Sequence, residues 1–164
     1  MARGTRDDRT TGHRPRVRTA ALAVAGVFVL VGLLGFVPGV TTGYDEMTVA
    51  GHGSGAKLLG VFQVSVLHNA VHLLFGLVGL VLARSVAGAR VFLAVGGAVY
   101  LALWLYGLVL SHGETPASAN VLPVNAADNW LHLGLGFGML LLGLLLSPGA
   151  GATAQRLDRP FDRP

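Results

Sequence analysis

Two segments of the sequence repeat a pair of polar residues that can bind metals, carry protons or form buried hydrogen bonds. Asn69 and His72 stand three positions apart, and Asn129 and His132 repeat that spacing sixty residues later. Both pairs lie in strongly apolar sequence, and residues three apart project from one face of a helix. Ionisable residues in apolar spans are functional candidates by default. The sequence therefore predicts a polar intramembrane cluster of these four residues.

Metal binding is one chemistry that the pattern allows. His68 precedes His72 by four residues, as Asp128 precedes His132. Three histidines and one carboxylate suit zinc, copper or iron, and two facing histidines can hold a haem.

A structural role is the main alternative, in which the Asn and His side chains hydrogen-bond across helices for about 0.6–2 kcal/mol each. Proton or solute handling is a third interpretation. Because i, i+4 spacing is common on helices, we expect the structural role without a cofactor. Haem, zinc and copper remain the alternatives.

The elements that position these residues are expected to be four membrane-spanning helices. The chain of 164 residues is 52% hydrophobic and only 12% charged, which is too apolar for a soluble protein of this size. Apolar stretches are expected to form the spans at residues 20–37, 58–83, 91–110 and 129–146. The second stretch is too long for one untilted span, so its first part is expected at the membrane interface. Eighteen residues rise about 27 Å, close to a hydrocarbon core of about 30 Å. A cleaved signal peptide is the alternative for the first span, but no A-x-A site follows it.

The repeat indicates two helical hairpins in parallel arrangement, although the first and third helices correspond weakly in sequence. Ser65 and Asn125 occupy equivalent positions and are good N-caps. Helices that start after them place His72 and His132 about two turns along, at matching depth. The predicted fold class is all-α, an antiparallel bundle of four transmembrane helices.

Basic residues predict the orientation of this bundle. Eleven lie in the N-terminal tail, the 84–90 loop and the C-terminal tail, whereas the loops at 38–57 and 111–128 contain only Lys57. Basic residues accumulate on the cytoplasmic side. We expect basic, disordered cytoplasmic tails at residues 1–18 and 148–164, on either side of a four-helix domain at 19–147.

Glycine is abundant, with 24 residues, and Gly134 and Gly138 form a G-x-x-x-G pattern. Such patterns allow membrane helices to approach closely. We expect these two glycines to pack inside the bundle, with contact between copies of the chain as the alternative.

Several classes of function are disfavoured. The chain has no cysteine, which excludes disulfides and thiol chemistry. It has no P-loop, no H-E-x-x-H and no G-x-S-x-G. Its basic residues flank apolar spans instead of forming a patch, which argues against nucleic acid. We therefore expect no enzymatic activity.

The chain resembles the domain of unknown function 4383 family at residues 33–40, 67–73 and 119–133. The paired His-Asn-x-x-His and Asp-Asn-Trp-Leu-His signatures carry the resemblance, which covers roughly residues 20–147. It implies a small four-helix membrane protein, mainly of actinobacteria, and brings no activity, substrate or cofactor.

The predicted protein is thus a multi-pass protein of the bacterial plasma membrane with both termini in the cytoplasm. Its expected role is non-catalytic and structural, with the lipid bilayer as partner and a homo-oligomer as one option. A metal- or haem-binding protein using His72 and His132, and a small transporter or channel subunit, are the alternatives.

Overall fold

The computed structural model describes residues 16–51, 53–112 and 124–146. In this part of the chain four α-helices are joined by short segments and a small sheet. In chain order the elements are α1 (Arg16–Leu34), β1 (Thr41–Thr42), a 3-10 helix (Tyr44–Glu46), β2 (Lys57–Leu58), β3 (Phe62–Gln63), α2 (Val66–Leu82), α3 (Val86–His112) and α4 (Ala126–Leu145).

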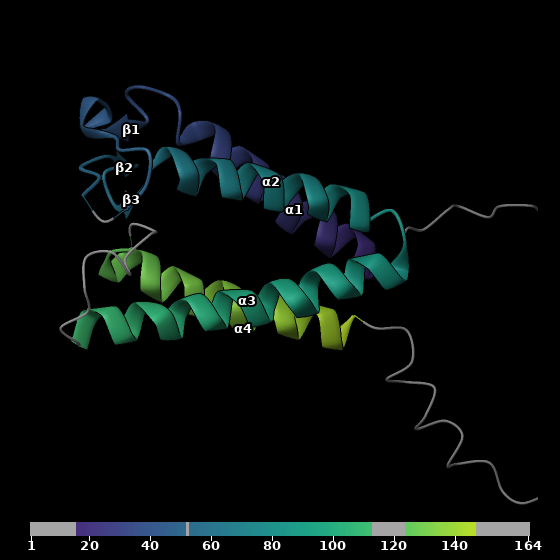
Figure 1. Cartoon of the computed structure of the whole chain (residues 1–164). Coiled ribbons are helices and arrows are strands. Elements are labelled where there is room, and N and C mark those ends of the chain that lie inside the picture. Colours follow the sequence, from purple (N-terminus) through teal and green to yellow (C-terminus); the bar gives the residue numbers. More distant parts are fainter. Residues whose placement is uncertain (1–15, 52, 113–123, 147–164) are drawn as a thin grey trace, which may run out of the picture.

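The helices form two hairpins that lie against each other (Figure 1). α1 packs along α2, and α3 packs along α4. Small and aromatic side chains fill the interior between the hairpins, because small residues bring helices close and aromatic rings fill the remaining space. The buried core consists of Val17, Ala21, Ala25, Phe28, Ala83, Ala89, Phe92, Leu93, Tyr100 and Met139.

Residues 35–65 form a folded cap over one end of the α1–α2 hairpin. Its three strands pair antiparallel in the order β1-β2-β3. The cap also satisfies helix ends, because Thr48 and Val49 accept hydrogen bonds from the backbone N–H groups of Val66 and Leu67 at the start of α2. A third cap residue, Thr41, donates its hydroxyl to the carbonyls of Leu34 and Gly35.

The cap corrects one prediction and refines another. The all-α class omitted the three-stranded sheet. In the apolar stretch 58–83, β2, a turn and β3 precede the helix, which begins at Val66, directly after the predicted N-cap Ser65. These residues are apolar because they pack on one another and on the end of α1, with Ala56, Leu58 and Val64 as the buried centre.

The predicted tails lie mostly outside the described residues, because residues 1–15 and 147–164 are not described. The boundary at residue 18 is corrected, because α1 already begins at Arg16. Arg18 donates from Nε to the Ala83 carbonyl at the C-terminal end of α2, at 3.0 Å. This bond satisfies one of the last carbonyls of that helix.

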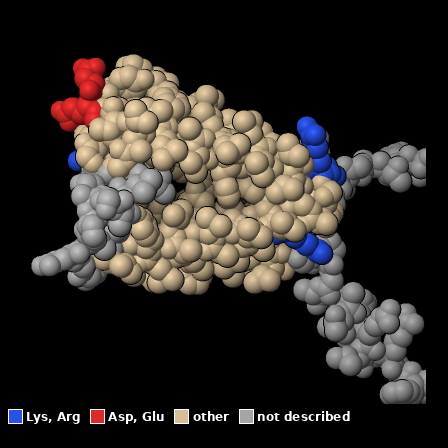
Figure 2. All heavy atoms as spheres, viewed as in Figure 1, with Lys and Arg blue, Asp and Glu red and all other residues tan. Residues whose placement is uncertain are grey.

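Three helices, α1, α3 and α4, are long and apolar enough to cross a membrane by length and composition. α2 is equally apolar but has 17 residues. Large hydrophobic side chains are exposed on all four helices, for example Leu30, Leu77, Val95 and Phe137. Figure 2 shows acidic side chains at the cap end, most basic side chains at the opposite end, and an uncharged surface between them.

Candidate functional site

The polar residues near the cap are positioned by two matching helix starts. The Ser65 hydroxyl accepts a hydrogen bond from the His68 backbone N–H at 3.1 Å. Asn125 accepts from the Asp128 backbone N–H at 2.9 Å, while Asp128 accepts from the Asn125 backbone N–H at 3.0 Å. The second helix therefore begins with a capping box. Both predicted N-caps are confirmed.

The two asparagines of the repeat face the first helix of their own hairpin. The Asn69 side chain lies directly against Gly35, and the Asn129 side chain against Gly107, so that a methyl group at either glycine would collide with the amide. Within the described residues, no hydrogen-bond donor reaches the buried Oδ1 of either asparagine. The Asn69 amide also donates to Met47 Sδ of the cap, at 4.0 Å. Both asparagines thus serve as packing groups within a hairpin, and Asn69 in addition contacts the cap.

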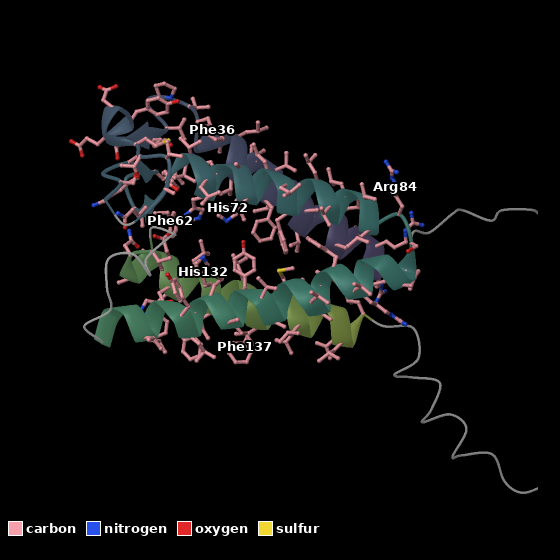
Figure 3. All side chains as sticks on the ribbon, in the orientation of Figure 1. Phe36, Phe62, His72, Arg84, His132 and Phe137 are labelled. Carbon is pink, nitrogen blue, oxygen red and sulfur yellow. The ribbon has the colours of Figure 1, made fainter. Side chains whose placement is uncertain are left out.

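The two histidines of the repeat face the other hairpin instead. In Figure 3 the side chains of His72 and His132 extend from opposite sides into the space between the hairpins. The His72 ring stacks on Phe28, with 5.6 Å between ring centroids, and the His132 ring meets the Tyr100 edge at 5.3 Å. Phe28 and Tyr100 themselves lie 5.3 Å apart, so the two ring pairs form one aromatic cluster.

The hairpins repeat the same contacts in structure. Gly76 packs on the backbone of Val29 and Gly136 packs on Leu101, as Asn69 packs on Gly35 and Asn129 on Gly107. Equivalent residues are 60 positions apart in α2 and α4 and 72 positions apart in α1 and α3. This second offset is difficult to see in the sequence, because few residue types are retained between the first and third helices.

A crevice with two lobes lies between the hairpins near the cap. The larger lobe, about 100 Å³, is lined by side chains of α1, the β2–β3 hairpin, α2 and α4. The smaller lobe, about 40 Å³, is lined by side chains of α2, α3 and α4 and by Val124. His68, His72 and His132 line both lobes. Figure 2 shows this face hollowed between the hairpins toward the cap.

Asp128 and Asn125 tie the cap to α4, and we call this pair the latch. Asp128 Oδ2 accepts from the Gln63 backbone N–H at 3.0 Å in addition to its capping bond. The Asn125 amide donates to the Val61 carbonyl at 2.7 Å. The latch therefore holds the β2–β3 hairpin over the larger lobe, which Asp128 also lines.

The structure brings some predicted site residues together and separates others. His68, His72 and His132 share the crevice, and Asp128 lines its larger lobe. Asn69 and Asn129 lie on other helix faces. Among the residues that the structure describes, no three His, Asp or Glu side chains are grouped to hold one metal ion. His72 instead directs Nδ1 at the His68 carbonyl oxygen, 3.2 Å away.

The packing prediction for Gly134 and Gly138 is corrected. A methyl group added at either glycine would have no neighbouring atom within 4 Å, so both glycines face away from the described part of the chain. Gly136, between them, makes the close approach to α3. A helix turns by about 100° per residue, so the glycine one or two positions away points elsewhere.

Sequence reasoning missed the latch partners Val61 and Gln63 and the aromatic pair Phe28 and Tyr100. Gln63 lies 65 residues from Asp128, and no local pattern connects them. Asn125 was recognised as a cap only, because its contact with Val61 depends on how the cap folds.

Comparison with known protein families gives a match over most of the chain. The family described as Domain of unknown function (DUF4383) matches residues 18–145. The chain belongs to this family. The matched region of this DUF4383 member includes the cap, the latch and both histidine-bearing helices. No curated protein and no solved structure matches the chain significantly.

Proposed function

We propose that this DUF4383 protein is an antiparallel bundle of two hairpins in parallel repeat that crosses a bacterial plasma membrane four times. The observation that carries the proposal is the apolar surface that separates the cap from the opposite end of the bundle, where most basic side chains lie (Figure 2). Asp45 and Glu46 are exposed on the cap, and Arg16 and Arg84 are exposed at the opposite end. The positive-inside rule then places the cap outside and both termini in the cytoplasm.

α2 is the span that needs a separate argument. Its 17 residues rise about 26 Å at about 1.5 Å per residue, and spans of about 17 residues are the short end of the observed range. All four first-turn N–H groups of α2 have partners, namely Thr48, Val49 and two atoms of Ser65. Satisfied backbone groups are what a helix end near hydrocarbon requires.

The sidedness of the termini tests this proposal. Four spans place both termini on the same side of the membrane, which the positive-inside rule makes the cytoplasm. Three spans place the termini on opposite sides. A reporter that is active only in the cytoplasm is expected to work at either terminus and to fail when inserted within residues 40–50. Activity at only one terminus contradicts the four-span arrangement.

We infer a non-catalytic role for the bundle, as a structural or interaction protein whose main partner is the lipid bilayer. The interior contacts support this inference, because close glycine contacts pack the helices within each hairpin and aromatic rings pack the hairpins against each other. The outward-facing Gly134 and Gly138 leave a surface for contact with a second copy of the chain, which a homo-oligomer would use.

A second candidate, metal binding, is favoured by one observation. A carbonyl only accepts hydrogen bonds, so His72 Nδ1 carries the proton that it shares with the His68 carbonyl. Histidine ligands are commonly fixed in this way, with the other ring nitrogen left for the metal. Zinc and copper suit imidazole, whereas a haem macrocycle is far larger than a lobe of about 100 Å³.

Metal analysis of the purified full chain separates the two candidates. Metal binding predicts stoichiometric zinc or copper that is lost in both His72→Gln and His132→Gln, because an amide is a poor ligand. The structural role predicts substoichiometric metal in the wild type and in both variants. Phe137→Leu, which changes an outward-facing side chain (Figure 3), is the control.

A further inference from the structure

The larger lobe of the crevice has the composition of a site for a small organic molecule. Ligand sites are mostly apolar, with a few placed polar groups. Apolar side chains from three parts of the chain line this lobe, among them Val31, Phe62 and Leu135, and the polar ones are His68, His72, Asp128 and His132. Nothing in the proposed scaffold role requires this combination.

Two polar groups of the lobe are hydrogen-bond acceptors. His72 Nδ1 carries a proton and donates it to the His68 carbonyl oxygen. In the neutral ring the other nitrogen, Nε2, is therefore an acceptor. The buried Asp128 carboxylate is a second acceptor, and its Oδ2 already receives two backbone N–H groups. A ligand that complements this lobe brings a hydrogen-bond donor.

His132 adds an unsatisfied group at the same place. Only 5% of this residue is exposed, and its buried Nδ1 has no hydrogen-bond partner among the described residues. An unpartnered buried polar atom destabilises the folded state. A ligand that hydrogen-bonds in the lobe would recover part of this free energy.

The volume limits the size of the ligand. The lobe measures about 100 Å³, whereas a cavity of about 150 Å³ holds benzene and drug-sized ligands need about 300–1,000 Å³. The ligand is therefore no larger than one small ring, with slight widening of the lobe.

The β2–β3 hairpin forms the adjustable wall of the lobe. Leu59 at its tip is held at φ 54°, a conformation that costs a leucine free energy, and it lines the lobe while 65% exposed. The latch holds this hairpin to α4 through two hydrogen bonds.

We propose that the larger lobe binds a lipid-soluble molecule of about one ring that carries an O–H donor, with His72 Nε2 as the acceptor. The proposal goes beyond the scaffold role and depends on the proposed membrane placement only for the route of entry, which is the outer half of the bilayer.

Two matched probes test the proposal on the full chain in lipid nanodiscs, with empty nanodiscs as the partition control. 4-Fluorophenol has the donor, and 4-fluoroanisole has a methyl group in its place; fluorine NMR measures the binding of each. We expect saturable binding of 4-fluorophenol that is at least tenfold tighter than that of 4-fluoroanisole. Equal binding of the two probes, or no saturation above the empty nanodiscs, overturns the proposal.

Three variants locate the binding. Leu135→Trp fills the lobe and is expected to abolish saturable binding, and His72→Leu is expected to remove the preference for the phenol. Phe137→Leu on the outer face is expected to bind like the wild type. A retained preference in His72→Leu overturns the assignment of the acceptor, and retained binding in Leu135→Trp overturns the assignment of the lobe. Because binding is measured in reconstituted protein, these results are independent of the topology test.

Discussion

At the residue scale, Asp128 joins two parts of the chain that are distant in sequence. One oxygen of its carboxylate completes the capping box of α4 and also holds β3 of the cap. Asn125 combines the same two tasks through its carbonyl oxygen and its amide nitrogen. Half of this arrangement could be predicted, because a cap is a local pattern. The contacts with Val61 and Gln63 could not, because they depend on where a cap more than sixty residues earlier folds.

Removing the Asp128 carboxylate is expected to release the cap from α4. Asp128→Ala leaves the N–H groups of Gln63 and Asn125 without their acceptor, which costs about 1–3 kcal/mol of unfolding free energy. Hydrogen exchange should show faster exchange of the Gln63 amide, with α1 and α2 unchanged. Asp45→Ala, at an exposed position of the cap, is the control. Unchanged protection of Gln63 in Asp128→Ala contradicts the latch.

The two N-caps provide a matched comparison. Ser65→Ala removes a helix cap, which typically costs about 0.5–2 kcal/mol. Asn125→Ala removes a cap and also the bond to the Val61 carbonyl, worth about a further 1 kcal/mol. Thermal unfolding followed by circular dichroism should therefore show the larger loss for Asn125→Ala. A smaller loss for Asn125→Ala would mean that the Val61 bond contributes nothing.

At the scale of elements, glycine positions decide how closely the helices pack. The G-x-x-x-G pattern predicted packing by Gly134 and Gly138, but spacing alone cannot tell which face of a helix meets a neighbour. The structure assigns the contact to Gly136 and leaves Gly134 and Gly138 outside. Likewise, the sequence indicated that the helix begins after Ser65 but not that residues 58–65 form strands, because composition without a clear period does not separate a buried strand from a helix.

Alanine substitutions distinguish the inner and outer glycines. A methyl group at Gly76 would lie 2.7 Å from the Val29 backbone nitrogen and 2.8 Å from the Ala25 carbonyl oxygen, so the helices must separate. We expect Gly76→Ala to destabilise the bundle by about 1–3 kcal/mol. Gly134→Ala meets no atom within 4 Å, so it should be neutral or slightly stabilising, since alanine favours helices. Equal melting temperatures for the two variants would contradict this packing.

At the scale of the whole molecule, the charge distribution was predictable and the crevice was not. Among the described residues, Arg16 and Arg84 lie at the end opposite the cap (Figure 2), as the positive-inside rule predicted, because that rule concerns loops and tails, which are visible in sequence. The crevice depends on how the two hairpins diverge near the cap. It also depends on the aromatic pair Phe28 and Tyr100, which joins the two hairpins. The repeated histidines indicated the right location, although the asparagines beside them serve a different contact.

The most direct test of the four-span arrangement uses the absence of cysteine from the chain. Val49→Cys lies on the cap, where Val49 is 75% exposed, and Arg84→Cys lies at the other end of α2 (Figure 3). A maleimide that cannot cross membranes should label Val49→Cys in intact cells and Arg84→Cys only after lysis. The chain without cysteine should remain unlabelled in both cases. Labelling of both positions in intact cells, or of neither, would place both ends of α2 on one side of the membrane and contradict the account.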